Sequence, residues 1–140
     1  MKAFIAYRFT GEDLTKLEPL LVGIRDSLKK KDIDSYCSFF DEEVFQGRSF
    51  TAQQIMAHAF REIDQSDFLF VLQTSDHKSE GLLMEVGYCI AKSMPVVVAV
   101  QSEVSQTYVP EMGNVVVRWT DVGQLVTEIE KIDFKELTTS

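Results

Sequence analysis

Short apolar segments alternate with amphipathic helical segments along the chain, and this order constrains the fold more than any other feature of the sequence. Five segments have the composition of buried strands: residues 2–7, 33–40, 68–72, 96–100 and 115–119. Apolar residues recur at helical spacing over residues 14–31, 50–64, 80–93 and 122–132. Pro19 lies inside the first helical pattern, so we expect that helix to begin near it or to bend there.

Continuously apolar strands joined by helices are typical of a parallel sheet that is covered on both faces. We therefore predict an α/β fold, a flavodoxin-like doubly wound sheet of five parallel strands in the order 2-1-3-4-5, with helices on both faces. The sequence shows no internal repeat and no Pro/Gly/Ser-rich linker, so residues 1–140 are expected to form a single domain. Ligands of such sheets bind beyond the carboxyl ends of the strands, which are residues 7–10, 40–41, 73–79 and the segment after Val100.

Charge and cysteine content narrow the classes of partner. The formal net charge is -8 and the longest basic run is Lys29–Lys31, which disfavours nucleic acid polymers and anionic membranes as partners. Cys37 and Cys89 lie in apolar segments and are expected to be buried, reduced thiols. No segment approaches the roughly 20 apolar residues of a membrane span, and the N-terminal apolar stretch is too short for a signal peptide, so we expect a cytoplasmic protein.

Several common catalytic motifs are absent from the sequence. It contains no G-x-x-x-x-G-K-[ST] phosphate loop and no G-x-G-x-x-G after the first strand. His58 and His77 are its only histidines, and no H-E-x-x-H or C-x-x-C pattern accompanies them, so we expect neither a metal nor another cofactor. His58 falls between the core positions of its helix and is expected to be exposed.

Residues 79–88 (Ser-Glu-Gly-Leu-Leu-Met-Glu-Val-Gly-Tyr) form the most informative segment. Ser79 can cap the helix that follows it. Glu85 then falls in the second turn among apolar neighbours, close to the ligand end of the sheet. This setting can perturb a carboxylate and makes Glu85 a candidate catalytic group, whereas the ordinary alternative is a glutamate that faces solvent.

The sequence offers further candidate residues, and all except Asp67 are expected at the ligand end of the sheet. Asp67 precedes the third strand, where an aspartate often serves only as a turn residue. Asp41 follows the second strand and has a solvated loop position as its alternative. Four aromatic side chains could hold a planar ring there or could belong to the core and its rim: Tyr7, Phe9, Phe40 and Phe45.

These segments together resemble the nucleoside 2-deoxyribosyltransferase family and its nucleotide N-glycosidase relatives. The similarity covers the first strand with Tyr7, residues 59–67 (Ala-Phe-Arg-Glu-Ile-Asp-Gln-Ser-Asp), residues 79–88, and Asn114 with Val115. It implies an enzyme that cleaves the N-glycosidic bond of a (deoxy)nucleoside or nucleoside 5′-monophosphate and transfers the sugar to another base or to water. Glu85 would be the nucleophile, Asp67 would organise the site, and Tyr7 would hold the nucleophile through a hydrogen bond.

The resemblance also implies a set of substrate-binding residues: Arg8, Phe9, Asp41, Phe45, Ser79, Gly81 and Asn114. Asn114 resembles a residue that family members lend to a neighbouring subunit, which implies a homo-oligomer. Transferases of the family carry an aspartate where this chain has Ser79, and that aspartate handles the leaving base. A serine there is similar to the branch that hydrolyses nucleoside 5′-monophosphates. The nearby acids Glu12, Asp13 and Glu80 disfavour phosphate unless basic side chains reach it, and the candidates are Arg8, Arg48 and Lys78.

A second resemblance concerns the N-terminal segment. Residues 4–8 (Phe-Ile-Ala-Tyr-Arg), followed by Gly-Glu-Asp at residues 11–13, are similar to the start of Toll/interleukin-receptor-type domains. Those domains are often signalling adaptors, and some cleave the nicotinamide glycosidic bond of NAD with a helix glutamate, which here would again be Glu85. Both resemblances lead to cleavage of an N-glycosidic bond. They differ in the leaving group and in whether catalysis matters at all, because the second implies a signalling or scaffold domain that is an NAD hydrolase only in some cases.

Overall fold

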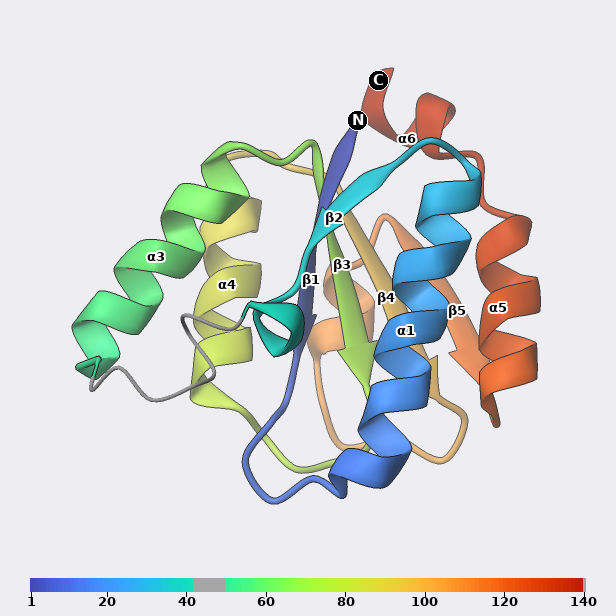
Figure 1. The fold of residues 1–140 in the computed structure, drawn as a ribbon, viewed down its shortest axis with the longest axis horizontal. Helices are drawn as coiled ribbons and strands as arrows, with labels where there is room; N and C mark the ends of the chain where they lie inside the picture. The colour runs from blue at the N-terminus through green and yellow to red at the C-terminus, as the bar shows by residue number, and fades with distance from the viewer. Residues whose placement is uncertain (42–49, 140) are drawn as a thin grey trace.

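A computed structural model describes residues 1–41 and 50–139 (Figure 1). Its five strands form one parallel sheet in the order β2-β1-β3-β4-β5, as predicted. The strands are β1 (Lys2–Tyr7), β2 (Asp34–Tyr36), β3 (Phe68–Gln73), β4 (Val96–Gln101) and β5 (Val115–Trp119). The helices are α1 (Leu14–Lys30), α3 (Ala52–Asp64), α4 (Glu80–Ala91), α5 (Val122–Glu130) and α6 (Phe134–Thr139), with short 3₁₀ helices η1 (Ser38–Phe40) and η2 (Val109–Met112).

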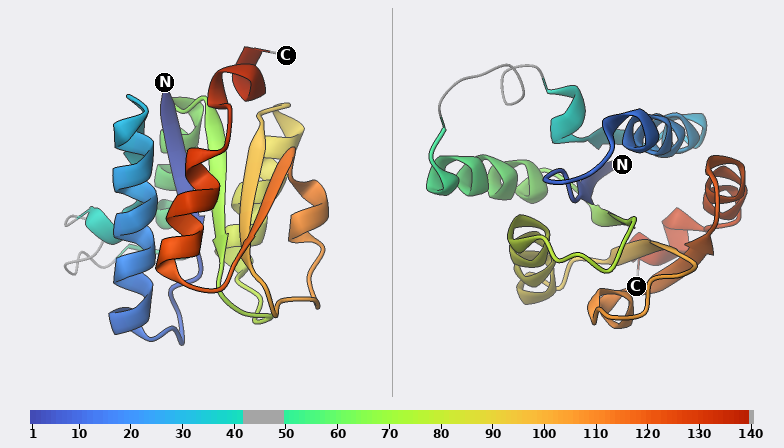
Figure 2. Two further views of the ribbon diagram at one scale, coloured as in Figure 1. Left: turned by 90° about the vertical axis from the view of Figure 1, so that its right-hand side faces the viewer. Right: turned by 90° about the horizontal axis from the view of Figure 1, so that it is seen from below.

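Helices cover both faces of the sheet, and each face has its own core. Along β1, Ala3 and Ile5 pack toward α1 and α5, while Phe4 and Ala6 pack toward α3 and α4, because successive side chains of a strand point to opposite faces (Figure 2). The central strand β3 and its neighbour β4 are buried almost throughout, which explains their continuous apolar sequence. Across the described part of the chain, every helix is too short or too polar to cross a membrane.

Side-chain caps fix where the helices begin. The Asp13 carboxylate accepts a hydrogen bond from the Thr15 N–H at 2.9 Å and starts α1 at Leu14, so the helix runs through Pro19 instead of beginning near it. Ser79 caps α4 as predicted, by accepting from the Leu82 N–H. Cys37 and Cys89 are buried and unpaired, also as predicted.

The second strand is shorter than the sequence indicates. Residues 33–40 were predicted to be one strand, but β2 ends at Tyr36 and the chain turns into η1. Its last paired residue, Tyr36, lies opposite Phe4, so the second half of β1 has no neighbour from β2. The apolar run continues because Phe39 and Phe40 pack against the core on the α1 side, not because they extend the strand. The helices η2 and α6 were not predicted.

Candidate active site

A cavity of about 80 Å³ lies where β2 leaves the edge of β1. Its walls come from β1, the end of β2, the start of η1, and the facing sides of α3 and α4. Five polar side chains line it: Tyr7, Tyr36, Ser38, His58 and Glu85. The early end of β2 therefore leaves room for a pocket beside β1.

Glu85 reaches this cavity from the middle of α4. The helix buries Leu82, Val86 and Cys89 against the sheet, and Glu85 lies next to that stripe on the side of α3. Its side chain is half-buried, and burial raises the pKa of its carboxyl group from 4.5 to about 8. Among the described residues the carboxylate has no hydrogen-bond partner. The fold thus holds an acid in a poorly solvated place without compensating it, which is typical of functional carboxylates.

Tyr7 also lines the cavity, but its hydroxyl bonds to a different partner from the one expected. The hydroxyl oxygens of Tyr7 and Ser38 lie 2.9 Å apart, and no hydrogen bond joins Tyr7 to Glu85 in the described structure. Burial, with the nearby charge of Glu85 adding to it, raises the pKa of Tyr7 far above its ordinary value. Tyr7 is therefore a neutral phenol near Glu85, and its predicted role of holding the nucleophile stays a prediction.

Three side chains on the opposite wall form a polar chain. The Tyr36 hydroxyl donates to Asp41 Oδ2 at 2.8 Å and lies 2.9 Å from His58 Nε2. The Tyr36 ring stacks on Phe4, and the His58 ring meets it edge-on. Asp41 thus lies beside the cavity as a partner of Tyr36 and His58. His58 was predicted to be exposed, but the structure shows it half-buried in the cavity wall.

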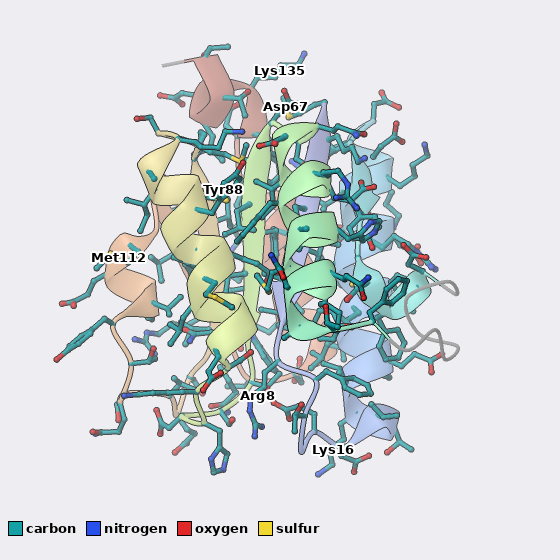
Figure 3. All side chains as sticks on the ribbon, turned by 90° about the vertical axis from the view of Figure 1, so that its left-hand side faces the viewer. Arg8, Lys16, Asp67, Tyr88, Met112 and Lys135 are labelled. Carbon is teal, nitrogen blue, oxygen red and sulfur yellow. The ribbon has the colours of Figure 1, made fainter. Side chains whose placement is uncertain are left out.

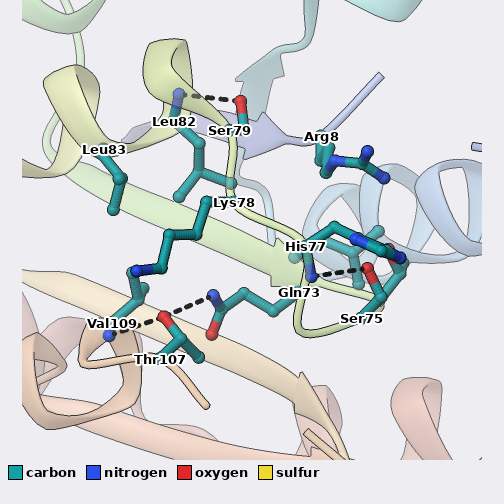
Figure 4. Close-up of a pocket in the computed structure, with 12 residues that line it drawn as sticks. Arg8, Gln73, Ser75, His77, Lys78, Ser79, Leu82, Leu83, Thr107 and Val109 are labelled. Carbon is teal, nitrogen blue, oxygen red and sulfur yellow. Dashed lines mark hydrogen bonds between the residues drawn. The ribbon is translucent and has the colours of Figure 1, made fainter. Parts of the chain in front are cut away.

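A second pocket lies at the N-terminus of α4 (Figure 4). Ser79, Arg8, Lys78 and Gln73 are among its lining residues, and its volume of about 20 Å³ is room for one water molecule. The Lys78 side chain extends across it toward η2, whereas Arg8 lies on the other side (Figure 4). The Gln73 side chain is buried, and its carbonyl oxygen has no hydrogen-bond partner there.

The Arg8 guanidinium is already paired. Its Nη1 lies 3.4 Å from Glu12 Oε1, and that oxygen also accepts a hydrogen bond from the Thr74 hydroxyl. Gly11 makes the turn between them with a φ of +80°, where a Cβ would lie 3.0 Å from the Arg8 guanidinium. The turn after β1 therefore places Arg8 beside α4 with its charge partly balanced by Glu12.

Two predicted site residues, Asp67 and Asn114, lie at the opposite end of the sheet, where the strands begin. Asp67 precedes β3 and accepts a hydrogen bond from the Lys2 N–H at 2.8 Å, so it secures the start of β1. Figure 3 shows it at the opposite end of the molecule from Arg8. Asp67 therefore lies away from the cavity of its own chain, at a turn position, and its role in the site stays a prediction.

Asn114 lies at the same end of the sheet as Asp67, because it directly precedes β5. Its side-chain oxygen accepts from the Val96 N–H at 2.8 Å and joins the starts of β4 and β5. It does not line the cavity of its own chain, and its role in the site of a neighbouring subunit stays a prediction.

The remaining predicted residues differ in position. Phe9 is exposed in the turn after β1, and Phe45 lies outside the described residues. Gly81 is in the first turn of α4, where a Cβ would meet only Met56 Sδ at 3.8 Å, an ordinary contact. No group of three His, Cys, Asp or Glu side chains within residues 1–41 and 50–139 is arranged to hold a metal ion.

Three of the polar lining residues were not predicted from the sequence: Tyr36, Ser38 and His58. A signal for His58 was present, because Ile55, His58 and Ala59 have the i, i+3, i+4 spacing of one helix face and all three line the cavity. Tyr36 and Ser38 had no such signal, since their place depends on where β2 ends.

Comparison with known protein families gives a match over most of the chain. The model of the nucleoside 2-deoxyribosyltransferase family matches residues 10–128. The chain belongs to this family. Glu85 and the cavity walls from β2, η1, α3 and α4 fall within the matched region, whereas the wall from β1 precedes it. No curated protein sequence matches the chain significantly.

Solved structures share the fold at low sequence identity. A 2-deoxyribosyltransferase from Bacillus psychrosaccharolyticus is 16% identical with a TM-score of 0.72, covering 98% of this chain and 96% of that chain. The Clostridium botulinum CMP N-glycosidase BcmB is 11% identical with a TM-score of 0.70, covering 93% and 98%. The solution structure of BlsM is 16% identical with a TM-score of 0.70, covering 93% and 90%. The fold of this chain is therefore the fold of these proteins.

Proposed function

We propose that this chain is an enzyme that cleaves the N-glycosidic bond of a (deoxy)nucleoside or nucleoside 5′-monophosphate with Glu85 as the nucleophile. The observation that carries the proposal is the half-buried Glu85 carboxylate in the cavity, whose pKa burial raises to about 8. Membership of a family named for deoxyribosyl transfer, and a fold shared with a CMP N-glycosidase, support this chemistry.

The proposed reaction has two displacements at one carbon atom. In the first, a Glu85 oxygen bonds to the anomeric carbon, the carbon–nitrogen bond breaks, and its electron pair leaves with the base. In the second, water or another base attacks the same carbon and the bond to Glu85 breaks, which regenerates the carboxylate. Weak solvation of Glu85 favours the first step, because a poorly solvated carboxylate is stabilised by the positive charge that develops on the sugar.

The acceptor in the second step is proposed to be water. The basis is Ser79, which stands where transferases of the family carry the aspartate that handles a base. In this structure the Ser79 hydroxyl is used to cap α4.

The first test is a substrate panel. Nucleosides, nucleoside 5′-monophosphates and NAD are incubated with the purified protein, with and without a second free base, and base release is followed by chromatography. Release without an acceptor supports hydrolysis, and a new nucleoside formed only with the acceptor would show transfer instead. Release of nicotinamide alone would support the activity of the second resemblance, and no release from any substrate would overturn the proposal.

The activity should depend on the ionisation of Glu85. With a pKa of about 8, the carboxylate must lose its proton to attack, so kcat/KM should rise as the pH rises and level off above about pH 8. A 4-nitrophenyl glycoside of the preferred sugar is the donor of choice, because its leaving group departs without a proton and only the nucleophile titrates. A profile that is flat from about pH 6 to about pH 10, roughly two units either side of the pKa of Glu85, would contradict this role.

Arg8 and Lys78 favour the nucleotide form of the substrate. Backbone N–H groups at a helix N-terminus attract anions, and these two cations line the pocket beside the N-terminus of α4. Neither side chain points at Ser79 in this structure (Figure 4), so a bound phosphate has to draw them in. We therefore propose that a 5′-phosphate binds there and replaces Glu12 as the partner of Arg8.

Two variants test the phosphate site in opposite directions. Arg8→Gln should lower kcat/KM for a nucleoside 5′-monophosphate by about 10- to 100-fold relative to the nucleoside, the range expected for one charged hydrogen bond. Glu12→Gln frees Arg8 from its present partner and should shift the same ratio in favour of the monophosphate. Equal effects on both substrates would show that the phosphate does not reach Arg8.

A further inference from the structure

The wall of the cavity across from α4 carries a group that can exchange protons. His58 comes from α3 and lines the same cavity as Glu85. Departure of a base needs such a group, because a neutral base leaves as an anion unless it receives a proton as the bond breaks. Ser79, which occupies the place of the family's base-handling aspartate, bonds to the backbone of α4.

The hydrogen bonds around His58 fix which ring nitrogen is available. An ionised Asp41 only accepts, so the single hydroxyl proton of Tyr36 goes to Asp41 Oδ2 at 2.8 Å. The contact of 2.9 Å between Tyr36 and His58 Nε2 is then a hydrogen bond only if Nε2 donates. Nε2 therefore carries a hydrogen in both charge states of the ring. Nδ1, which has no hydrogen-bond partner among the described residues, gains and loses the second proton.

The position of the ring is also held by packing. Tyr36 stacks on Phe4 with ring centroids 5.5 Å apart, and His58 meets Tyr36 edge-on at 5.7 Å. The Asp41 carboxylate lies 3.5 Å from His58 Nε2, on the same side of the ring as Tyr36. An oriented imidazole backed by a carboxylate is the arrangement that acid–base catalysis uses.

We propose that His58 donates a proton to the leaving base and, in the second step, takes one from the attacking water. In the first step the Nδ1–H bond breaks, and its proton bonds to the electron pair that the broken glycosidic bond leaves on the base. The base therefore departs as a neutral molecule. In the second step neutral His58 removes a proton from water as the water oxygen bonds to the anomeric carbon. Its proton is thereby restored, so the cycle consumes none.

This inference rests on the proposed function and adds the residue that serves the leaving group. It also explains why His58 and Glu85 share a cavity. A proton that moves from Glu85 to His58 produces the carboxylate that attacks and the imidazolium that donates, without a change in the net charge of the cavity. Tyr36 and Asp41 are positioning residues, since they act on the base only through His58.

The test compares leaving groups that do and do not need a proton. His58→Gln keeps a donor that can reach Tyr36 but removes the exchangeable proton. For the base that the wild-type protein releases best, we expect kcat/KM to fall by about 10²- to 10⁴-fold. For the same sugar carrying a 7-methylpurine, which leaves as a neutral molecule without protonation, or a 4-nitrophenyl group, we expect a loss below about fivefold, since no acid is needed.

A second pair of variants separates catalysis from folding. Tyr36→Phe keeps the ring but removes the hydroxyl that holds His58, and it should reduce release of the ordinary base more than release of the activated group. Tyr88→Phe removes a comparable hydroxyl, one that donates to Asp64 at 2.7 Å between α4 and α3 outside the cavity, and should leave that ratio unchanged. If His58→Gln does not fold by circular dichroism, this pair decides the question.

The outcomes are distinct. Equal losses for both leaving groups in His58→Gln, or no loss for either, would overturn the role of His58 while leaving that of Glu85 intact. A Tyr36→Phe ratio equal to that of Tyr88→Phe would overturn it as well. A wild-type protein that releases no base from any donor would instead refute the proposed function.

Discussion

Replacing Glu85 by glutamine should reduce base release by at least about 10³-fold, because the amide cannot form the covalent bond to the sugar that the two-step reaction requires. Glutamine has nearly the size of glutamate and suits a helix, so α4 should keep its place. The measurement is kcat/KM for the best substrate of the panel. Glu128→Gln is the matched control, because it makes the same change on α5, which covers the opposite face of the sheet.

The covalent intermediate gives this prediction a second readout. Wild-type protein that is mixed with substrate and rapidly denatured should gain the mass of the sugar on the peptide that contains Glu85, and Glu85→Gln should not. If Glu85→Gln retained more than about a tenth of the wild-type activity, the loss would be far smaller than that expected for a missing nucleophile, and Glu85 would not be the nucleophile. Loss of activity without any adduct in the wild type would instead favour direct attack by water, with Glu85 acting through its charge.

The sequence was sufficient to predict the sheet and the position of Glu85. The positions of the strands and helices follow from the periodicity of apolar residues, and the strand order follows from the rules for parallel sheets. The periodicity is a strong signal because every residue of a buried strand contributes to it. β3 and β4 are buried almost throughout, so the pattern there is unambiguous. Glu85 was recognisable because a single acid interrupts an apolar stretch of α4.

The shape of the cavity was not predictable in the same way. It depends on β2 ending at Tyr36, whereas Cys37 and Phe39–Phe40 are as apolar as a strand and pack into the core from a 3₁₀ turn. Asp67 illustrates a second limit, because closeness in sequence to an apolar strand does not place a residue at the ligand end of the sheet. Asp67 precedes β3, and ligands bind where β3 ends.

The stability of Glu85→Gln should differ from that of the wild type in a way that depends on pH. Burial raises the pKa of Glu85 from 4.5 to about 8, so the folded state binds its proton more tightly than the unfolded state does. The stability this contributes is present in full below about pH 4.5 and is lost as the pH rises through about 8. Glutamine does not titrate, so the variant should gain on the wild type across that interval.

The expected size of this gain is limited by the solvent that Glu85 still contacts. The full shift corresponds to about 5 kcal/mol at 1.36 kcal/mol per pKa unit, and for a half-buried side chain we expect about 2 to 3 kcal/mol at pH 8.5. Urea unfolding of both proteins at pH 5 and pH 8.5 measures it, with Glu128→Gln expected to follow the wild type at both. Parallel stabilities at the two pH values would mean that Glu85 is solvated in solution. A variant that is more stable than the wild type at pH 8.5 and inactive would show that the fold tolerates an unfavourable carboxylate for the sake of the reaction.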